Sequence, residues 1–224
     1  MFLCSNVRFA VLSLLGIAAL SVSLAGPARA QAYDFSRFVS GGGGGQDPQK
    51  KRLATSMGAH VCLMIGRGVE PNTMRFIIAS KIPQPNSRIA AVAFDMGRHG
   101  RLFQGLAVQL ASSGVKARVE PAQPHPFLAG LTPEYWVHVD SRGHLSPEGL
   151  GPGRMISITV TLGTGVTVDD VILALNEGLN PVSGANGLRV GVIAMYLLGG
   201  PPPGVGTIQD DGGFVTAAPS ARCQ

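Results

Sequence analysis

Two histidines and an aspartate in the middle of the chain are the candidates for a metal site. His138 and Asp140 are two residues apart in an alternating segment, so in a strand both would point to the same face. His144 follows closely, and imidazole together with carboxylate suits zinc or related ions. The same residues equally fit a solvated strand face, and His125, between two prolines, fits a surface loop. We therefore predict no metal site.

Calcium is the one cofactor that the sequence brings into consideration. Asp210 and Asp211, with Asp140, could join backbone carbonyls around this ion, because calcium prefers hard oxygen ligands in loops. No Asp-x-Asp-x-Asp-Gly string supports such a site. The sequence Asp210-Asp211-Gly212-Gly213 is also typical of a turn, and the turn is the favoured interpretation.

A serine and a lysine match a known nucleophile motif. Ser113 and Lys116 have the S-x-x-K spacing in which a lysine one helical turn away activates a serine. That geometry needs a helix, whereas this stretch has the composition of a strand and turn. Neither S-D-N nor K-T-G occurs, and no G-x-S-x-G elbow is present, so the motif predicts no catalysis.

Four carboxylates could form an acid/base pair near His138. They are Asp95, Glu134, Asp140 and Glu148, and some of them lie near the Tyr135-Trp136 pair in the sequence. Glycosidases use two carboxyl groups held within about 10 Å of each other. Trp136, the only tryptophan, could stack on a sugar or fill a contact between two sheets or between a sheet and a loop. This set carries the alternative hypothesis of a carbohydrate-active or metal-assisted hydrolase.

The first 30 residues have the features of a cleavable bacterial signal peptide. Arg8 gives a positive start, Phe9 to Leu24 is an uncharged apolar run, and Ala28-Arg29-Ala30 is a small-x-small cleavage pattern. An uncleaved anchor is the alternative, but Gly26-Pro27 interrupts the run. We expect a periplasmic or extracellular mature chain that begins near residue 31 and has no membrane span after cleavage.

Composition argues against nucleic acid as a partner. The formal charge of the whole chain is +5, and removal of Arg8 and Arg29 leaves 16 basic against 13 acidic residues, a charge of +3. Nucleic-acid binders usually carry a clustered basic stripe, whereas only Lys50-Lys51-Arg52 cluster here. A hydrophobic content of 45% with 14% charged residues instead predicts a folded domain.

Two cysteines remain after removal of the signal peptide. Cys62 and Cys223 lie near opposite ends of the mature chain, in a compartment that permits disulfides. They could pair, or Cys62 could be a small buried hydrophobe while Cys223 belongs to a frayed tail. Both interpretations remain open from the sequence alone.

The elements that would position these residues are short strands. Apolar or alternating runs separated by Gly, Pro and Asn predict an antiparallel β-sandwich of the jelly-roll or immunoglobulin-like type. The interval between the runs at 106–110 and 115–119 predicts a hairpin or a bulge. The predicted strands lie at residues 59–65, 74–80, 88–95, 106–110, 115–119, 135–140, 155–162, 188–198 and, as a last edge strand, 207–216.

One helix is expected among the strands. The apolar residues from Val168 to Leu179 follow helical spacing, Thr167 can cap the first turn with Asp170, and Gly178 is placed for a left-handed C-cap. Three further regions complete the predicted organisation. They are a flexible Gly-rich arm at 31–56, a single β-sandwich domain at 57–216 and a C-terminal tail at 217–224.

The carboxyl half resembles secreted β-sandwich modules of bacterial exosortase-sorted (PEP-CTERM-type) proteins. The resemblance covers roughly residues 88–216. It rests on a strand ending in Phe94-Asp95, the Gly114–Val119 strand, and the phrases HLSPEGLGPG, TVDDVILALNEG and LRVGVIAM. It implies an extracellular sandwich and no assigned reaction. Such proteins end in a sorting motif, a transmembrane helix and a basic tip. This chain ends GGFVTAAPSARCQ, so that route of surface sorting is not expected.

The function expected from the sequence is a secreted, non-enzymatic structural or binding module. The reason is that no nucleophile, base and oxyanion set converges in the pattern. Whether the chain is an enzyme is left open, with the hydrolase as the alternative. The expected partners are an extracellular polysaccharide or a protein.

Overall fold

The structure is a computed structural model. It describes residues 31–41, 58–82, 87–111, 115–121, 128, 130–140, 149–180, 186–197, 208–216, 219–220 and 223. The predicted signal peptide at 1–30 lies outside these residues. Within them, no helix is both long enough and apolar enough to cross a membrane.

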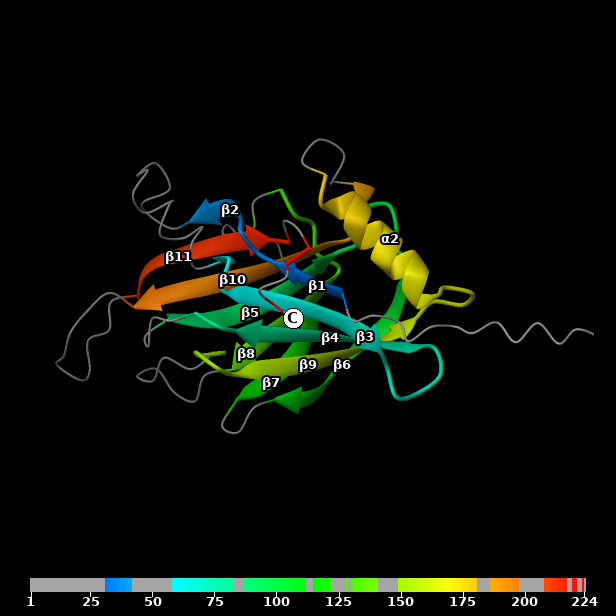
Figure 1. The fold of residues 1–224 in the computed structure, drawn as a ribbon, viewed down its shortest axis with the longest axis horizontal. Coiled ribbons are helices and arrows are strands. Elements are labelled where there is room, and N and C mark those ends of the chain that lie inside the picture. Colours follow the sequence, from blue (N-terminus) through cyan, green and yellow to red (C-terminus); the bar gives the residue numbers. More distant parts are fainter. Residues whose placement is uncertain are drawn as a thin grey trace, which may run out of the picture.

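The described chain forms two sheets in which every strand pair is antiparallel (Figure 1). The strand order is β1-β3-β4-β9-β6 in the first sheet and β2-β11-β10-β5-β8-β7 in the second. This confirms the predicted mainly β, antiparallel fold with one short helix in the described part, α2 (Val168–Gly178). The strands are β1 (Gln31–Asp34), β2 (Arg37–Gly41), β3 (Val61–Arg67), β4 (Thr73–Ser80), β5 (Ser87–Asp95), β6 (Phe103–Ala111), β7 (Lys116–Pro121), β8 (Tyr135–Asp140), β9 (Met155–Leu162), β10 (Arg189–Leu197) and β11 (Ile208–Val215).

Both sheets contribute to one hydrophobic core. Phe76 of β4 and Phe94 of β5 belong to different sheets and meet edge to face, with ring centroids 5.2 Å apart. Phe103 of β6 packs against both rings. The shared core is consistent with the predicted sandwich. The alternation in β9 correctly predicted the face that enters this core: Ile156, Ile158, Val160 and Leu162.

The helix α2 begins as its sequence predicts. The Thr167 hydroxyl accepts a hydrogen bond from the Asp170 backbone N–H at 3.2 Å, and the Asp170 carboxylate accepts one from the Thr167 backbone N–H at 2.8 Å. This capping box satisfies two amide donors at the helix start. The helix buries Val171 and Leu175 against the core.

The predicted left-handed cap at Gly178 is wrong. The helix is capped by Leu179 in a right-handed conformation, with φ −71° and ψ −23°. Gly178 is needed for a close approach instead, because a Cβ at this position would lie 2.0 Å from the Leu188 carbonyl oxygen. A Cβ at Gly187 would lie 2.2 Å from the Gly178 nitrogen. The two glycines therefore let the helix end pack directly on the chain that enters β10.

Gly178→Ala is expected to lower the free energy of unfolding by about 1–3 kcal/mol, the usual cost of forcing extra volume into a packed site. The backbone clash outweighs the gain of about 1 kcal/mol that alanine brings to a helix interior. Urea unfolding checks the effect, with Leu173→Ala as the control because Leu173 is exposed on the same helix. An alanine variant at 178 as stable as the control would contradict this explanation.

The predicted flexible arm at 31–56 is wrong for residues 31–41, which form β1 and β2. Tyr33 and Phe35 are completely buried in the core, so this stretch has enough apolar surface to be held in place. β1 pairs with β3 in the first sheet, and β2 pairs with β11 in the second. The two strands thus take neighbouring chain segments to different sheets. Residues 42–57, with most of the glycine run, lie outside the described residues.

Three further expectations at strand ends are corrected. β6 and β7 do not form a hairpin, since β6 pairs with β9 and β7 with β8. β11 is not an edge strand, because it lies between β2 and β10. The predicted tail at 217–224 is attached at described positions: Pro219 forms a bridge with Tyr33, and Cys223 is disulfide-bonded to Cys62 with a Cα–Cα distance of 5.4 Å.

Candidate functional site

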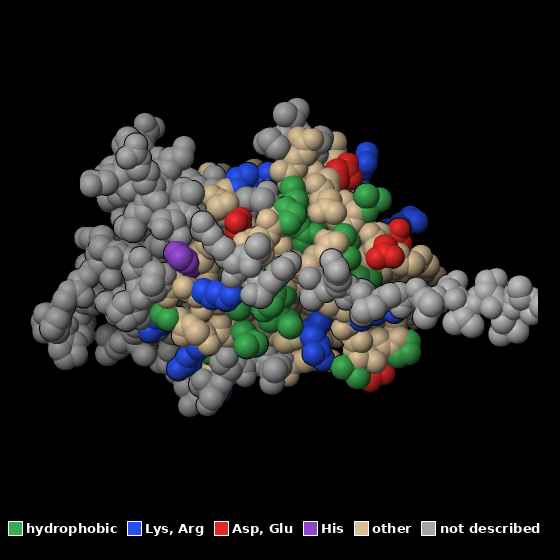
Figure 2. All heavy atoms as spheres, viewed as in Figure 1, with side chains coloured by type: hydrophobic (Ala, Val, Ile, Leu, Met, Phe, Trp, Pro, Cys, Tyr) green, Lys and Arg blue, Asp and Glu red, His purple; other side chains and the backbone are tan. Residues whose placement is uncertain are grey.

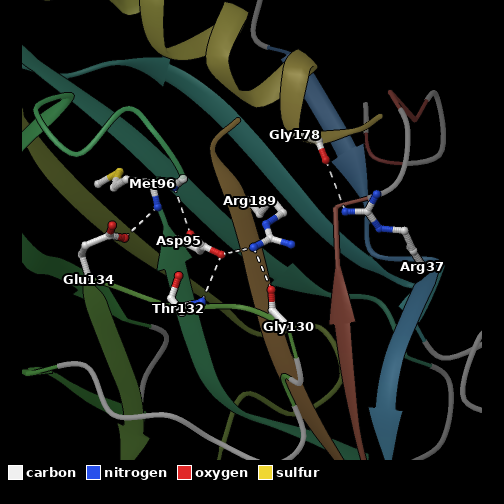
Figure 3. A network of polar contacts seen from close by, with 9 residues as sticks. Arg37, Asp95, Met96, Gly130, Thr132, Glu134, Gly178 and Arg189 are labelled. Atoms are coloured by element: carbon white, nitrogen blue, oxygen red, sulfur yellow. Dashed lines mark hydrogen bonds and ion pairs between the residues drawn. The ribbon is translucent and has the colours of Figure 1, made fainter. Parts of the chain in front are cut away.

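A buried carboxylate organises one end of the second sheet (Figure 3). Asp95, the last residue of β5, is completely shielded from solvent. One of its oxygens accepts hydrogen bonds from the Arg189 guanidinium and from the Thr132 N–H at 3.2 Å. The other accepts from the Gly97 N–H at 3.0 Å. Register explains the ion pair, because Arg189 opens β10 directly opposite Asp95.

Two arginines bind backbone carbonyls near this carboxylate (Figure 3). Arg189 also donates to the Gly130 carbonyl at 2.8 Å, which holds the loop before β8. Arg37 of β2 donates to the carbonyls of Gly178 and Leu179, both at 3.3 Å, where a cation offsets the negative end of the helix dipole. Burial lowers the pKa of Arg37, and the positive charge of Arg189 lowers it further.

The structure brings Glu134 close to Asp95, as the predicted acid/base pair required. The Glu134 carboxylate accepts a hydrogen bond from the Met96 N–H at 2.7 Å. Burial raises the pKa of Glu134, and the charge of Asp95 raises it further, against the lowering effect of the hydrogen bond. However, Asp95 is inaccessible and its oxygens already have donors, so it cannot contact a substrate. Glu134, by contrast, is exposed.

The effect of Glu134→Gln on the free energy of unfolding is expected to be more favourable at pH 7 than at pH 4. Because the folded state raises the pKa of Glu134, the wild type loses stability as the pH rises from the unfolded pKa through the folded one. Glutamine keeps an acceptor for Met96 but cannot ionise. Urea unfolding of both proteins at the two pH values measures the difference. An equal effect of the substitution at both pH values would contradict the assigned pKa direction.

The histidine candidates are not brought to the same place as these carboxylates. His138 lies opposite Ala91 in the register, four residues before Asp95 along β5, or about 13 Å at strand spacing. Its Nε2 is 3.1 Å from the Glu120 carboxylate on the neighbouring strand β7. Asp140 ends β8, but its side chain is outside the description. His125, His144 and Glu148 lie outside the described residues, within which no metal-binding group of three or more ligands is found.

The remaining motif residues take ordinary strand positions where they are described. Lys116 begins β7, so it is not on the helix that the S-x-x-K mechanism requires, and Ser113 lies outside the described residues. Asp210 and Asp211 are inside β11, and Asp211 lies opposite Met195 of β10. The interpretation of residues 210–213 as a turn is therefore wrong, because these residues continue a strand pairing.

Trp136 fills a contact between a sheet and a loop. It is 4% exposed and lies on the face of β8 opposite the shared core. The ring is therefore not free to stack on a sugar. It belongs to a second, smaller apolar cluster with Ala91, Ala93, Leu128, Leu131 and Ile193.

The described chain also has a surface groove that the sequence did not predict. It has a volume of about 570 Å³ and lies between the β3–β4 turn and the start of α2. Val69, at the tip of this turn, is 78% exposed. An apolar residue among turn formers was the only signal in the sequence. The groove is lined by Arg67, Gly68, Val69, Glu70, Pro71, Asn72, Thr73, Leu162, Val166, Thr167, Val168 and Asp169.

The groove has mixed charge. Arg67 is its cation and Glu70 and Asp169 are its acids, and Asp169 suits the first turn of α2 because of the helix dipole. The β3–β4 turn and the start of α2 lie at the right of Figure 1, and in the same view Figure 2 shows basic, acidic and hydrophobic side chains together at this end. Histidine and cysteine do not occur in the lining, so it offers neither an imidazole base nor a thiol nucleophile.

Comparisons with known proteins give no family. No family model, curated protein or solved structure matches this chain.

Proposed function

We propose that this chain is an exported, non-enzymatic binding module that holds a protein partner in the groove between the β3–β4 turn and α2. The observation that carries the proposal is the groove itself, with Val69 presented to solvent at its rim. Leu173, 70% exposed one helical turn beyond Asp169, extends the apolar surface along α2.

The fate of the chemical candidates supports binding rather than catalysis. Asp95 is buried with donors on both oxygens, Glu134 holds the Met96 amide, and His138 faces Glu120. Each group therefore stabilises a local contact. A hydrolase would need an accessible pair of acid and base that converges on one cleft.

The chemistry of the groove favours a protein over a polysaccharide. Sugar sites usually offer an aromatic face for stacking, whereas the lining contains no aromatic side chain. Trp136 is buried elsewhere. Isolated apolar side chains beside both signs of charge instead suit a peptide segment with apolar and charged residues.

Export rests on the N-terminal sequence, and the fold is compatible with cleavage after Ala30. The first strand begins at Gln31, so removal of residues 1–30 would leave β1 intact. N-terminal sequencing of the exported protein tests this part. A chain beginning near Gln31 is expected, and an intact Met1 would overturn it.

The binding proposal is tested by selecting displayed random peptides on the purified mature chain. Val69→Asp is expected to lower the affinity of the chain for the selected peptides at least tenfold, because it puts a charge at the apolar rim of the groove. Val119→Asp is the matched control, since Val119 is also exposed but lies on β7 in the other sheet. It should leave binding unchanged.

Three results would overturn the proposal. One is selected peptides that bind both variants equally. Another is binding of polysaccharides that Val69→Asp abolishes. The third is turnover in a panel of glycoside and ester substrates that Glu134→Gln removes, which would establish the hydrolase alternative instead.

A further inference from the structure

The C-terminal segment crosses from the second sheet to the first. After β11 ends, the Thr216 N–H donates to the Val190 carbonyl of β10 at 3.0 Å. Pro219 then forms an antiparallel bridge with Tyr33 of β1, and the Ser220 N–H donates to the Ala32 carbonyl at 2.8 Å. We call Pro219, Ser220 and Cys223 the C-terminal strap.

The strap is fixed by the disulfide to the outer face of the first sheet. Cys62 points away from the main core, next to Ala79 of β4 and opposite Asp34 of β1 in the register. Cys62 and Cys223 are both almost completely buried. They form a small apolar cluster of their own with Ala32 and Ala79, against which Met64 packs.

The described non-covalent attachments of the strap all go to β1. They are the Tyr33–Pro219 bridge, the hydrogen bond from the Ser220 N–H to the Ala32 carbonyl, and the Cys223 sulfur 3.6 Å from the Tyr33 carbonyl oxygen. The buried side chains next to the disulfide, Ala32 and Ala79, are small, whereas the main core holds rings such as Tyr33 and Phe35. The disulfide is the covalent attachment among these contacts, and neither cysteine belongs to the main core.

We propose that the strap is a redox-dependent closure of the β1 edge: reduction of Cys62–Cys223 releases Pro219, Ser220 and Cys223 while the two sheets stay folded. Release would leave the Ala32 carbonyl without its partner and uncover the small cluster at Ala79. An open strand edge of this kind can accept another extended chain. The proposal uses no residue of the groove, so it holds or fails independently of the proposed binding function.

The chemistry needs a dithiol as the co-reactant. A thiolate of the dithiol attacks one sulfur of the pair, which breaks the Cys62–Cys223 bond and forms a mixed disulfide. The second thiolate of the dithiol then displaces the protein sulfur. Overall the disulfide gains two electrons and two protons and becomes two thiols, and the dithiol becomes a disulfide. Because both sulfurs are buried, local opening must precede the attack.

Hydrogen exchange followed by mass spectrometry tests the strap on the full mature chain. Dithiothreitol reduction is expected to speed exchange of the Ser220 and Cys223 amides at least tenfold. The Ile158 amide on the central strand β9 should keep its rate. Cys223→Ser should reproduce the fast exchange without reductant. Ser220→Ala, which keeps the disulfide and the backbone N–H, should exchange slowly like the oxidised wild type.

Two outcomes would overturn the proposal. In one, the Ser220 and Cys223 amides remain protected in the reduced protein and in Cys223→Ser, which would mean that non-covalent contacts hold the strap. In the other, the Ile158 amide loses protection together with the strap, which would mean that the disulfide holds the whole fold. If the buried bond resists dithiothreitol, Cys223→Ser alone decides between these outcomes and the expected one.

Discussion

Asp95→Asn is expected to lower the free energy of unfolding by about 3–5 kcal/mol, the usual loss when one partner of a buried ion pair is removed. Asparagine leaves the Arg189 guanidinium, which is 14% exposed, without its counter-charge. It also weakens the acceptors for the Gly97 and Thr132 amides, because a neutral amide oxygen accepts less strongly than a carboxylate. Urea unfolding at pH 7 measures the loss.

A double-mutant cycle separates the ion pair from the packing around it. Arg189→Met is expected to cost a similar amount, since it leaves the buried Asp95 charge with backbone donors only. The double variant should cost less than the two losses added together, with a coupling of about 0.5–3 kcal/mol. Strictly additive losses would show that the two side chains act independently and would contradict the assigned pairing.

The large expected effect follows from the position of the pair in the chain. Asp95 ends β5, Arg189 begins β10, and the loop that carries Gly130 and Thr132 leads into β8. One carboxylate therefore fixes the point at which three chain segments meet. The sequence offered Asp95 as a catalytic carboxylate because residue type alone does not reveal burial.

The parts of the fold that the sequence predicted are those with a local periodic signal. In β9 the alternation identified the residues that enter the core, and the capping box of α2 follows from Thr167 and Asp170. The polar face of β9 is a partial exception: Ser157 and Thr159 are also shielded from solvent, because β9 lies between β4 and β6. The alternation of a strand predicts the face to which each side chain points, whereas the exposed fraction of that side chain depends on the neighbouring strands.

The parts that the sequence did not predict depend on partners distant in the chain. Residues 31–41 were interpreted as an arm because of the glycine run after them, yet Tyr33 reaches the core and its hydroxyl lies 3.0 Å from the Asn176 amide oxygen on α2. The Arg37 contacts with the end of α2 and the groove beside Val69 arise in the same way. The contacts of Tyr33 and Arg37 with α2 form only when segments more than a hundred residues apart pack together. The groove forms only when the β3–β4 turn lies beside the start of α2.

Removal of the disulfide is the other change with a large expected effect. Cys62→Ala together with Cys223→Ala is expected to lower the free energy of unfolding by up to about 5 kcal/mol. The bond spans a sequence separation of 161 residues, so it constrains most of the mature chain when unfolded. Urea unfolding of the oxidised wild type and the double variant measures the loss, and the variant should also show a steeper dependence on urea because its unfolded chain is more expanded.

The proposed release of the C-terminal strap makes the value of about 5 kcal/mol an upper limit. Without the bond, the folded chain can release the C-terminal strap and gain conformational entropy, which offsets part of the loss. The double variant should therefore fall short of the full value while the main core keeps its cooperative transition. Equal stability of the variant and the oxidised wild type would contradict this account, because the bond would then constrain neither state. A variant without any cooperative transition would show instead that the small cluster at Cys62 supports the whole sheet.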